Sequence, residues 1–451
     1  MAIAIALILL VIGTVLFHFL SPWWFTPIAS NWQMMDDTVH VTFWVTGIVF
    51  VAVNLFLAYA VIRYRHRAGG EKAHYEPENK KLEWWLTIVT SVGIAAMLAP
   101  GLSVWAKFVT VPDEAAEVEV LGQQWNWSYR LPGKDEALGK TDIRFVSIDN
   151  PFGMDPGDQA GQDDVLVASP ELHLPLDKPV KMLLRSKDVN HQFAVPQFRV
   201  KMDVVPGMVT YFWLTPTRTG SFDALCEQLC GMAHFAMRGR VVVDEQKDYD
   251  TWLAAQPTFS KTQAELTGNA ETGKTLFATC TTCHGAQAEG NRELNAPKLS
   301  GQGKWYLAQQ LRDFRNGVRG THENDIYGKQ MAPFAAMLAD DTAIRDVVEY
   351  IASLEEARPP ASVLGDPERG KTLYATCANC HGTQGQGIWA TNAPRLANMS
   401  DWYMQRQMQN FREGIRGKHP QDFRGAQMAS MAKVLADEKA ISDVLDYVHT
   451  L

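Results

Sequence analysis

A twelve-residue segment in the middle of the chain holds side chains that suit copper. Residues 226–237 read CEQLCGMAHFAM, so two cysteines lie four apart, a histidine follows four residues later and a methionine three after that. Thiolate, imidazole and thioether groups are soft or borderline ligands, the set that suits copper. Two thiolates on one tight loop can bridge two metal ions, and the upstream sequence DVNHQF supplies a second nitrogen. The spacing predicts a binuclear copper site that passes one electron at a time, with ligands at His191, Cys226, Cys230, His234 and Met237.

The copper interpretation explains more of this segment than its alternatives do. Two cysteines in an exported domain could form a disulfide, but the ligand spacing of His234 and Met237 would then be accidental. A zinc site rarely recruits a methionine. We therefore favour copper.

Two C-x-x-C-H motifs later in the chain are typical of covalent c-type heme attachment. Two thioether bonds fix the porphyrin, and the following histidine becomes the proximal iron ligand. The residues are Cys280, Cys283 and His284 in the first motif and Cys377, Cys380 and His381 in the second. The chain has six cysteines, so the copper pair and the two motifs use all of them and none remains for a structural disulfide.

The two heme motifs belong to a tandem duplication. Shifting the chain by 97 residues superposes the motifs, and also Met331 on Met428, without a gap. His322 and His419 align as well and are the main alternative for the sixth iron ligand. Methionine is favoured because His/Met ligation raises the heme potential, as a donor to copper requires. Met331 and Met428 are therefore the predicted axial ligands.

The elements that must hold these sites begin with a membrane anchor. Three apolar runs have the ~20 residues that cross a bilayer as a helix: Ile3–Leu20, Val39–Ile62 and Trp84–Trp105. The loop Arg63–Arg67 is basic, and the positive-inside rule therefore places it in the cytoplasm and everything after the third run in a bacterial periplasm. The first run could instead be a signal peptide, but it lacks a basic n-region and a clear cleavage site before Pro22. We therefore expect the first run to be retained, so that the anchor has three membrane helices.

The region after the anchor has short strand-like runs with turn residues between them, which favours a sandwich or barrel. These runs are Glu117–Leu121, Ile143–Ile148, Val180–Ser186, Val209–Leu214 and Arg240–Val243. The insertion Asp149–Asp164 is rich in Asp, Gly and Pro. A solvated loop is favoured there over a cation site built from oxygens.

These patterns divide the chain into a membrane anchor (residues 1–108), a copper domain (109–255) and two all-α cytochrome domains (267–355 and 366–451). Each cytochrome domain ends in a run with helical apolar spacing, Thr342–Leu354 in the first and Lys439–Leu451 in the second. Linkers are predicted at Gln256–Asn269 and Glu355–Pro367, and the second is expected to be stiff because it contains two consecutive prolines.

The segment CEQLCGMAHFAM, with DVNHQF and KMDVVPG before it, resembles subunit II of the heme–copper cytochrome c oxidases from about Trp44 to Val243. The resemblance implies a cupredoxin-like Greek-key barrel, fused here to two class I cytochrome c domains. It implies that Cys226 and Cys230 bridge the coppers, and that His191 and His234 are terminal ligands. Met237 and the Glu227 carbonyl would be weak axial ligands. A third membrane helix departs from the usual two of that family.

The resemblance also suggests roles for three further groups. The Glu227 side chain would help to hold a magnesium or manganese ion at the boundary with subunit I. Trp125 would be the residue through which electrons enter, with the core and rim of the barrel as the ordinary alternative. Glu83 would mark the mouth of a proton path in subunit I, and an interfacial carboxylate paired with Lys80 or Lys81 is the alternative.

Together these features predict the electron-transfer subunit of a proton-pumping cytochrome c oxidase in the inner membrane of a bacterium. Its partners would be subunit I, which reduces oxygen, subunit III and a cytochrome c or similar donor. A formal net charge of −8 argues against nucleic-acid binding. The alternatives are the copper subunit of a nitric oxide reductase and a freestanding membrane-anchored electron shuttle. The sequence alone does not order the two hemes.

Overall fold

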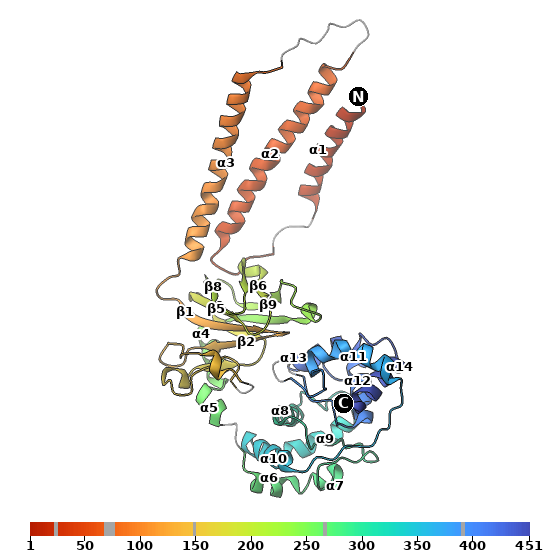
Figure 1. Ribbon diagram of the computed structural model, residues 1–451. Coiled ribbons are helices and arrows are strands. Elements are labelled where there is room, and N and C mark those ends of the chain that lie inside the picture. The colour runs from red at the N-terminus through yellow and green to blue at the C-terminus, as the bar shows by residue number, and fades with distance from the viewer. Residues whose placement is uncertain (22–25, 67–76, 148–149, 265–267, 389–392) are drawn as a thin grey trace.

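The computed structural model describes residues 1–451 except 22–25, 67–76, 148–149, 265–267 and 389–392. Three parts follow one another in Figure 1: long helices, a β-domain at their end and a group of shorter helices beside that β-domain. The fold is therefore the multidomain arrangement predicted from the sequence, with membrane helices, an all-β cupredoxin-like domain and all-α cytochrome domains.

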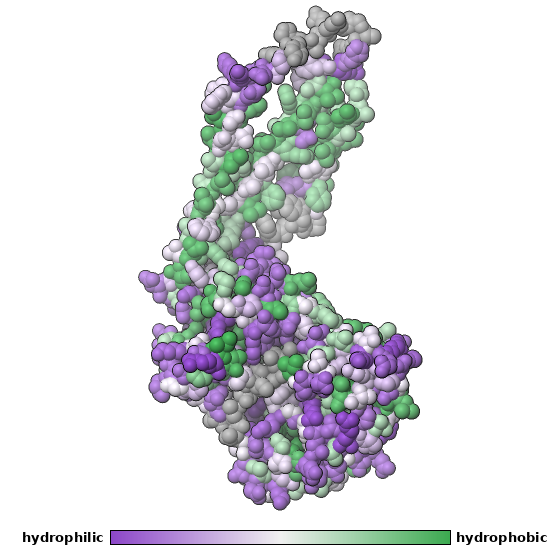
Figure 2. Space-filling model, viewed as in Figure 1, coloured by the Kyte–Doolittle hydropathy of each residue, from purple (hydrophilic) through white to green (hydrophobic). Residues whose placement is uncertain are grey.

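The long helices are α1 (Ala2–Leu20), α2 (Gln33–Arg63) and α3 (Lys80–Val109). All three are long and apolar enough to cross a membrane, with hydropathies of 2.8, 2.4 and 1.7 over their most apolar windows. Figure 2 shows apolar side chains along their surface, whereas the face of the other two parts is mostly hydrophilic. Such an exposed apolar surface needs lipid or a partner around it. Of the basic loop Arg63–Arg67, only Arg67 lies outside the described residues.

The β-domain is a sandwich of two five-stranded sheets. One sheet has the order β3-β2-β1-β5-β8 and the other β4-β10-β9-β6-β7. Strands β1 and β5 are parallel, as are β4 and β10, and the remaining ladder pairs are antiparallel. The bounds are β1 Ala116–Gln123, β2 Asn126–Leu131, β3 Val165–Val167, β4 Glu171–Pro175, β5 Val180–Ser186, β6 His191–Val195, β7 Val200–Val204, β8 Thr210–Leu214, β9 Gly220–Cys226 and β10 Arg238–Asp244.

Alternating burial along the strands builds one core between the sheets. In β5 and β10 every second side chain is buried, as expected when one face of a strand covers a core. Trp127 and Phe193 meet edge to face at 5.0 Å in the middle of this core. The rigid sandwich therefore ends in fixed loops, including the loop between β9 and β10 that carries the cysteines.

The sandwich is attached to the membrane helices by specific contacts. Arg199 makes a two-pronged ion pair with Asp36 of α2, with N···O distances of 2.7 and 2.9 Å. Trp213 of β8 accepts a bond from the Trp32 indole through its carbonyl (2.9 Å) and donates one from its own indole to the Lys107 carbonyl of α3 (3.1 Å). The planar geometry of the arginine pair fixes orientation as well as distance. The β-domain is thus held at one end of α2 and α3.

Each cytochrome domain crosses its first and last helices at a glycine. In the first domain α6 (Ala270–Phe277) lies against α10 (Asp341–Ser353), and in the second α11 (Pro367–His381) lies against α14 (Glu438–Thr450). A Cβ at Gly273 would lie 1.8 Å from the Asp346 carbonyl oxygen, and one at Gly370 would lie 1.9 Å from that of Asp443. Only glycine permits this approach. The remaining helices are α7 Thr281–His284, α8 Lys304–Arg315, α9 Ile326–Ala336, α12 Asp401–Glu413 and α13 Phe423–Ala432.

One sequence prediction about local structure was wrong. The predicted strand Ile143–Ile148 is not a strand over its described residues, 143–147: Ile143–Phe145 form a 3₁₀ turn capped by Asp142, and Ile143 is 85% exposed. Its polar cap and the turn that follows leave it no partner strand among the described residues. The linker at Gln256–Asn269 contains a short helix, α5 (Phe259–Ala264), because Phe259 is fully buried against the β-domain.

The side chain of His173 connects two strands of the second sheet with the helix that follows them in the chain. His173 of β4 lies 2.5 Å from Asp244 and 3.4 Å from Glu171, and it stacks on Trp252 of α4 (Gln246–Ala255) at 4.4 Å. Burial alone would lower the pKa of His173, but the two carboxylates outweigh burial and the pKa is raised above 6.5. The charged imidazolium is therefore the form that the fold favours.

Replacing His173 with glutamine is expected to remove a pH-dependent part of the stability of the β-domain. A histidine whose folded-state pKa is raised contributes stability that is complete below its unfolded pKa of 6.5 and is lost as pH rises through the folded-state pKa. Thermal unfolding followed by β-sheet circular dichroism from about pH 6 to about pH 9 should show a smaller decline in the His173→Gln protein. An identical decline in both proteins would contradict this reading.

Candidate metal centre and heme sites

Three strand ends bring the predicted copper ligands together. His191 is the first residue of β6, Cys226 is the last residue of β9, and Met237 directly precedes β10. Cys230 lies in the intervening loop, and His234 begins a single 3₁₀ turn there. Four of the five side chains are buried, and His234 is half-buried. The loop between β9 and β10 thus folds back over the end of β6.

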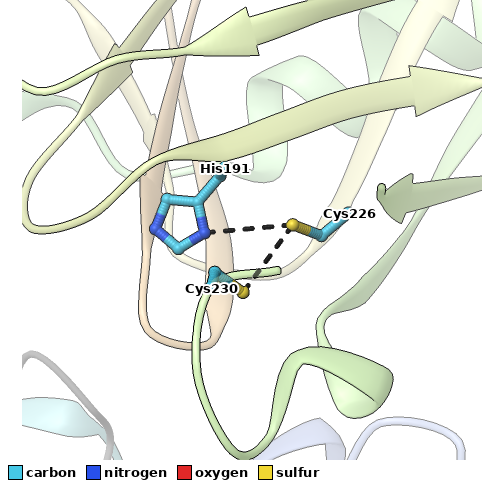
Figure 3. Close-up of side chains that lie close together, drawn as sticks. All are labelled: His191, Cys226 and Cys230. Atoms are coloured by element: carbon cyan, nitrogen blue, oxygen red, sulfur yellow. Dashed lines mark hydrogen bonds between the residues drawn. The ribbon is translucent and has the colours of Figure 1, made fainter. Parts of the chain in front are cut away.

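The ligand atoms form one compact group of sulfur and nitrogen. The Sγ atoms of Cys226 and Cys230 lie 3.7 Å apart, and His191 Nδ1 lies 4.0 Å from Cys226 Sγ. Figure 3 shows these three side chains pointing toward one another from separate segments. On the other side, Cys230 Sγ lies 3.5 Å from His234 Nδ1 and 3.8 Å from Met237 Sδ. Two thiols at the centre with an imidazole on either side fit a pair of copper ions.

The two thiols share their protons unequally. The pKa of Cys226 is lowered to about 3, first because of its contact with Cys230 and then because of His191 and nearby backbone amides. The same contact raises the pKa of Cys230, together with burial. The thiolate is the metal-binding form of cysteine. The contact between the two thiols therefore favours loss of the first proton from the pair, which gives a thiolate that can bind a metal.

A carboxylate fixes the orientation of the upstream histidine. Asp188 Oδ1 lies 2.8 Å from His191 Nε2, and Asp188 Oδ2 accepts a bond of 2.6 Å from the backbone of Gln124. A hydrogen bond at one ring nitrogen decides which nitrogen is left for a metal. Here Nδ1 is left and points at Cys226. The sequence motif contained Asp188 three residues before His191, but its role as an orienting residue was missed.

Gln124 and Trp125 hold the copper loop from behind. The carbonyl oxygen of Cys230 accepts bonds from Gln124 Nε2 (2.7 Å) and from Trp125 Nε1 (3.1 Å). The next residue, Gly231, has φ +119°, and a Cβ there would lie 2.9 Å from the Gln124 amide and 3.0 Å from the Trp125 ring. The glycine is therefore needed for this close approach. Trp125, the predicted residue for electron entry, contacts the backbone of a predicted ligand.

Glu227 lies between the two cysteines with its side chain exposed. Its carboxylate is 3.4 Å from Lys201 Nζ, an exposed pair of little energetic weight. The carboxylate thus faces outward from the copper group, on the surface of the domain. Its predicted roles, a carbonyl ligand and a magnesium or manganese ligand, stay predictions.

A cavity lined mainly by apolar side chains runs through both cytochrome domains and reaches all the predicted heme residues. His284 Nδ1 donates to the Pro297 carbonyl (2.8 Å), and His381 Nδ1 donates to the Pro394 carbonyl (2.7 Å). Burial lowers the pKa of both histidines, so the neutral ring is favoured. This leaves Nε2 as the free ligand atom in each domain. Cys280, Cys283, Met331, Cys377, Cys380 and Met428 line the same cavity.

The alternative axial ligands do not line this cavity. His322 and His419 instead accept backbone bonds through Nδ1 within tight turns, from Asn324 (3.2 Å) and Gln421 (3.3 Å). Met331 and Met428 lie in α9 and α13 and border the cavity. The geometry therefore favours the methionines over the histidines as sixth ligands.

Two buried arginines where the cytochrome domains meet offer donors to an anionic group. Arg319 donates to Gln310 of its own domain (2.6 Å) and to Tyr403 (2.8 Å) and Gln407 (3.0 Å) of the other. Arg416 makes the equivalent bonds from the second domain. It donates to Gln407 of its own domain (3.0 Å) and to Tyr306 (3.1 Å) and Gln310 (2.7 Å) of the first. Both Nε atoms are buried without a hydrogen-bond partner in the part of the chain that the structure describes. Unpaired buried donors at a cavity wall fit the carboxylates of a heme.

Glu83 lies far from these sites, in the first turn of α3, where it is exposed. Among the described residues, no ion pair joins it to Lys80 or Lys81. The structure thus does not bring it together with the other predicted residues, and its role at a proton path stays a prediction.

Comparisons with known proteins agree with this geometry. Residues 116–245 match the family "Cytochrome C oxidase subunit II, periplasmic domain", and residues 270–355 and 367–451 match "Cytochrome c". The alternative cytochrome c oxidase subunit 2 of Bradyrhizobium diazoefficiens is 60% identical over 260 residues, covering 58% of this chain and 94% of its own length. Cytochrome c oxidase subunit 2 of Cereibacter sphaeroides is 29% identical over 236 residues, covering 51% and 77%.

Among solved structures, reduced cytochrome c4 from Pseudomonas stutzeri has a TM-score of 0.33 and 25% identity. It covers 41% of this chain and 99% of its own. The periplasmic domain of subunit II of cytochrome oxidase from Bradyrhizobium japonicum has a TM-score of 0.23 and 26% identity, covering 32% and 95%.

Replacing Met237 with leucine tests the assignment of the copper ligands. The swap keeps the buried volume and costs less than about 1.5 kcal/mol of stability, so the domain should fold. The absorption and redox potential of the copper centre should shift, because an axial thioether tunes both, while both heme spectra stay unchanged. Met208→Leu is the matched control, since Met208 lies in the same domain, is exposed and stands outside the sulfur group. Altered heme spectra in Met237→Leu would contradict the assignment.

Proposed function

The chain belongs to the cytochrome c oxidase subunit II family, and from this premise we propose that it passes electrons from two covalent c-type hemes through a binuclear copper centre to subunit I. There oxygen is reduced to water and protons are pumped. The proposed parts are the anchor (1–108), the copper domain (109–255) and the cytochrome domains (267–355 and 366–451). The copper domain and both cytochrome domains would lie in the periplasm of a bacterium with a multi-pass anchor in its inner membrane.

The observation that carries this proposal is the continuity of the sites. The sulfur group at Cys226 and Cys230 is joined by hydrogen bonds through Trp125 to the cytochrome domains, within one chain. Copper and heme supply one-electron redox chemistry when they are bound. A chain that would hold copper and heme in domains joined by hydrogen bonds, on a membrane anchor, is suited to electron transfer toward a membrane partner.

The residues of the chain hold and orient these groups. His191, Cys226, Cys230, His234 and Met237 would hold the copper ions. Asp188 keeps the His191 ring turned toward the sulfurs, and Gln124 keeps the loop in place. A site whose ligands are fixed beforehand changes little between oxidation states, which favours rapid electron exchange. Cys280, Cys283, His284 and Met331, and their counterparts Cys377, Cys380, His381 and Met428, would hold the hemes.

The exposed apolar surface of the membrane helices supports the proposal of a partner subunit in the membrane. Many large apolar side chains on α2 and α3 are exposed, as for helices that contact lipid or another subunit. Subunit I would cover part of this surface, with subunit III as a further partner. Glu83 at the start of α3 would then face a proton path in subunit I, and Glu227 would hold magnesium or manganese at the same boundary. An external cytochrome c or a similar carrier would supply the electrons.

Purification from native membranes in mild detergent tests this proposal. The chain should copurify with a subunit that contains a- or b-type heme, and the preparation should consume oxygen in a cyanide-sensitive reaction. Turnover of nitric oxide alone would assign the chain to a nitric oxide reductase. Recovery of only c-type heme and copper, without a partner, would favour a freestanding shuttle. Both of these results contradict the oxidase proposal.

A further inference from the structure

Among the described residues, the hydrogen bond from the cytochrome region to Trp125 comes from the second cytochrome domain and not from the first. Gln427 of α13 donates from Nε2 to the Trp125 carbonyl oxygen at 2.6 Å, across a separation of 302 residues. Cys380 and Met431 pack against the core of the copper domain, and Asn379 Nδ2 lies 3.5 Å from Met232 Sδ in the copper loop. Figure 1 shows α11 and α13 on the side of the β-domain, with α6 and α7 farther away. The second cytochrome domain thus lies nearer to the copper domain than the first does, although the first follows the copper domain directly in the chain.

The contact continues to the predicted copper ligands without a break. Trp125 donates from its indole to the Cys230 carbonyl (3.1 Å), while its own carbonyl accepts from Gln427. Gln427 directly precedes Met428, the predicted axial iron ligand, in the chain and is joined to it by a peptide bond. Two hydrogen bonds and the covalent atoms between them therefore connect Cys230 with Met428. Electron tunnelling is faster along bonded and hydrogen-bonded atoms than across gaps, so this is a short connection between the two sites.

The internal repeat supplies a comparison surface. In the first domain, Gln330 and Phe334 occupy the positions of Gln427 and Met431. Both are exposed, with Phe334 at 43%, whereas both counterparts are half-buried against the copper domain. The same face of the repeat is thus covered in one copy and open in the other. The two copies are similar in sequence, but only the second has this face packed against the copper domain.

The two cytochrome domains are held to each other by the mirror-related arginine bonds. Arg319 and Arg416 each reach into the opposite domain, to Tyr403 and Tyr306 respectively. Lys298 adds a bond of 2.8 Å to the Asn398 carbonyl. The first domain therefore contacts the second closely, while its own copy of the docking face remains open.

We infer that the second cytochrome domain is the resident electron donor to copper, docked through Gln427 onto Trp125, and that electrons reach it from the first domain. With heme and copper bound, one electron would leave the heme of the second domain, oxidising its iron from ferrous to ferric, and would reduce the copper pair by one electron. The inference rests on the proposed function and adds the order of the sites. The first domain is then the one that faces an external donor.

The test compares Gln427→Met with Gln330→Met in the purified oxidase complex. Methionine keeps the length of glutamine but removes the amide donor, and the two positions are equivalent in the repeat. Loss of one hydrogen bond should lower the docking equilibrium constant roughly fivefold in Gln427→Met and slow heme-to-copper electron transfer by up to this factor. Transient absorption after injection of one electron into the hemes measures this rate, and hydrogen–deuterium exchange of the copper loop measures docking independently.

The expected result is slower transfer and faster exchange of residues 228–236 in Gln427→Met, with both values unchanged in Gln330→Met. Effects in Gln330→Met alone, equal effects in both, or no effect in either would overturn the inference. Failure of the unaltered complex to pass electrons from heme to copper at all would instead overturn the proposed function. Unchanged heme and copper spectra in both variants show that the sites themselves are intact.

Discussion

The carbonyl oxygen of Cys230 accepts two hydrogen bonds, and the arrangement of the sites depends on it. Gln124 and Trp125 reach it from the turn between β1 and β2, while Cys230 holds its sulfur 3.7 Å from Cys226 on the other side of the loop. A single peptide group thus fixes both the ligand loop and the ring that the second cytochrome domain contacts. Gly231 permits this approach because it has no Cβ. The predicted ligand loop and the contact with the second cytochrome domain are therefore connected through one residue.

Fusion of the domains changes the physics of electron delivery. A free carrier must find the copper site by diffusion, whereas a tethered domain is present at a high effective concentration. The mirror-related bonds of Arg319 and Arg416 add a fixed contact between the two cytochrome domains. Their Nε atoms are buried without a hydrogen-bond partner among the described residues, which fits an anionic group in the cavity. The same side chains thus join the domains and fit the carboxylates of the hemes.

Features that depend on the spacing of neighbouring residues could be predicted from the sequence. The heme motifs and the copper loop are read from a few neighbouring residues, and the strand Val180–Ser186 has the predicted bounds because its alternation is regular. Ile143–Ile148 failed because an apolar run does not reveal whether a partner strand is available. The role of Asp188 requires the direction of the His191 ring. The contact of Gln427 with Trp125 was beyond reach, because two similar repeats offer the same face and only their packing selects one.

In the proposed electron path, the copper pair is the obligatory link between the hemes and oxygen. Substitution of Cys226 by serine removes one bridging sulfur from the copper domain and leaves both heme motifs unaltered. The direct measurement is the rate at which oxygen oxidises the pre-reduced c-type hemes in the purified complex. The account predicts that the hemes of Cys226→Ser stay reduced after oxygen is added, with normal heme content. Oxidation of these hemes at the rate of the unaltered complex would contradict it.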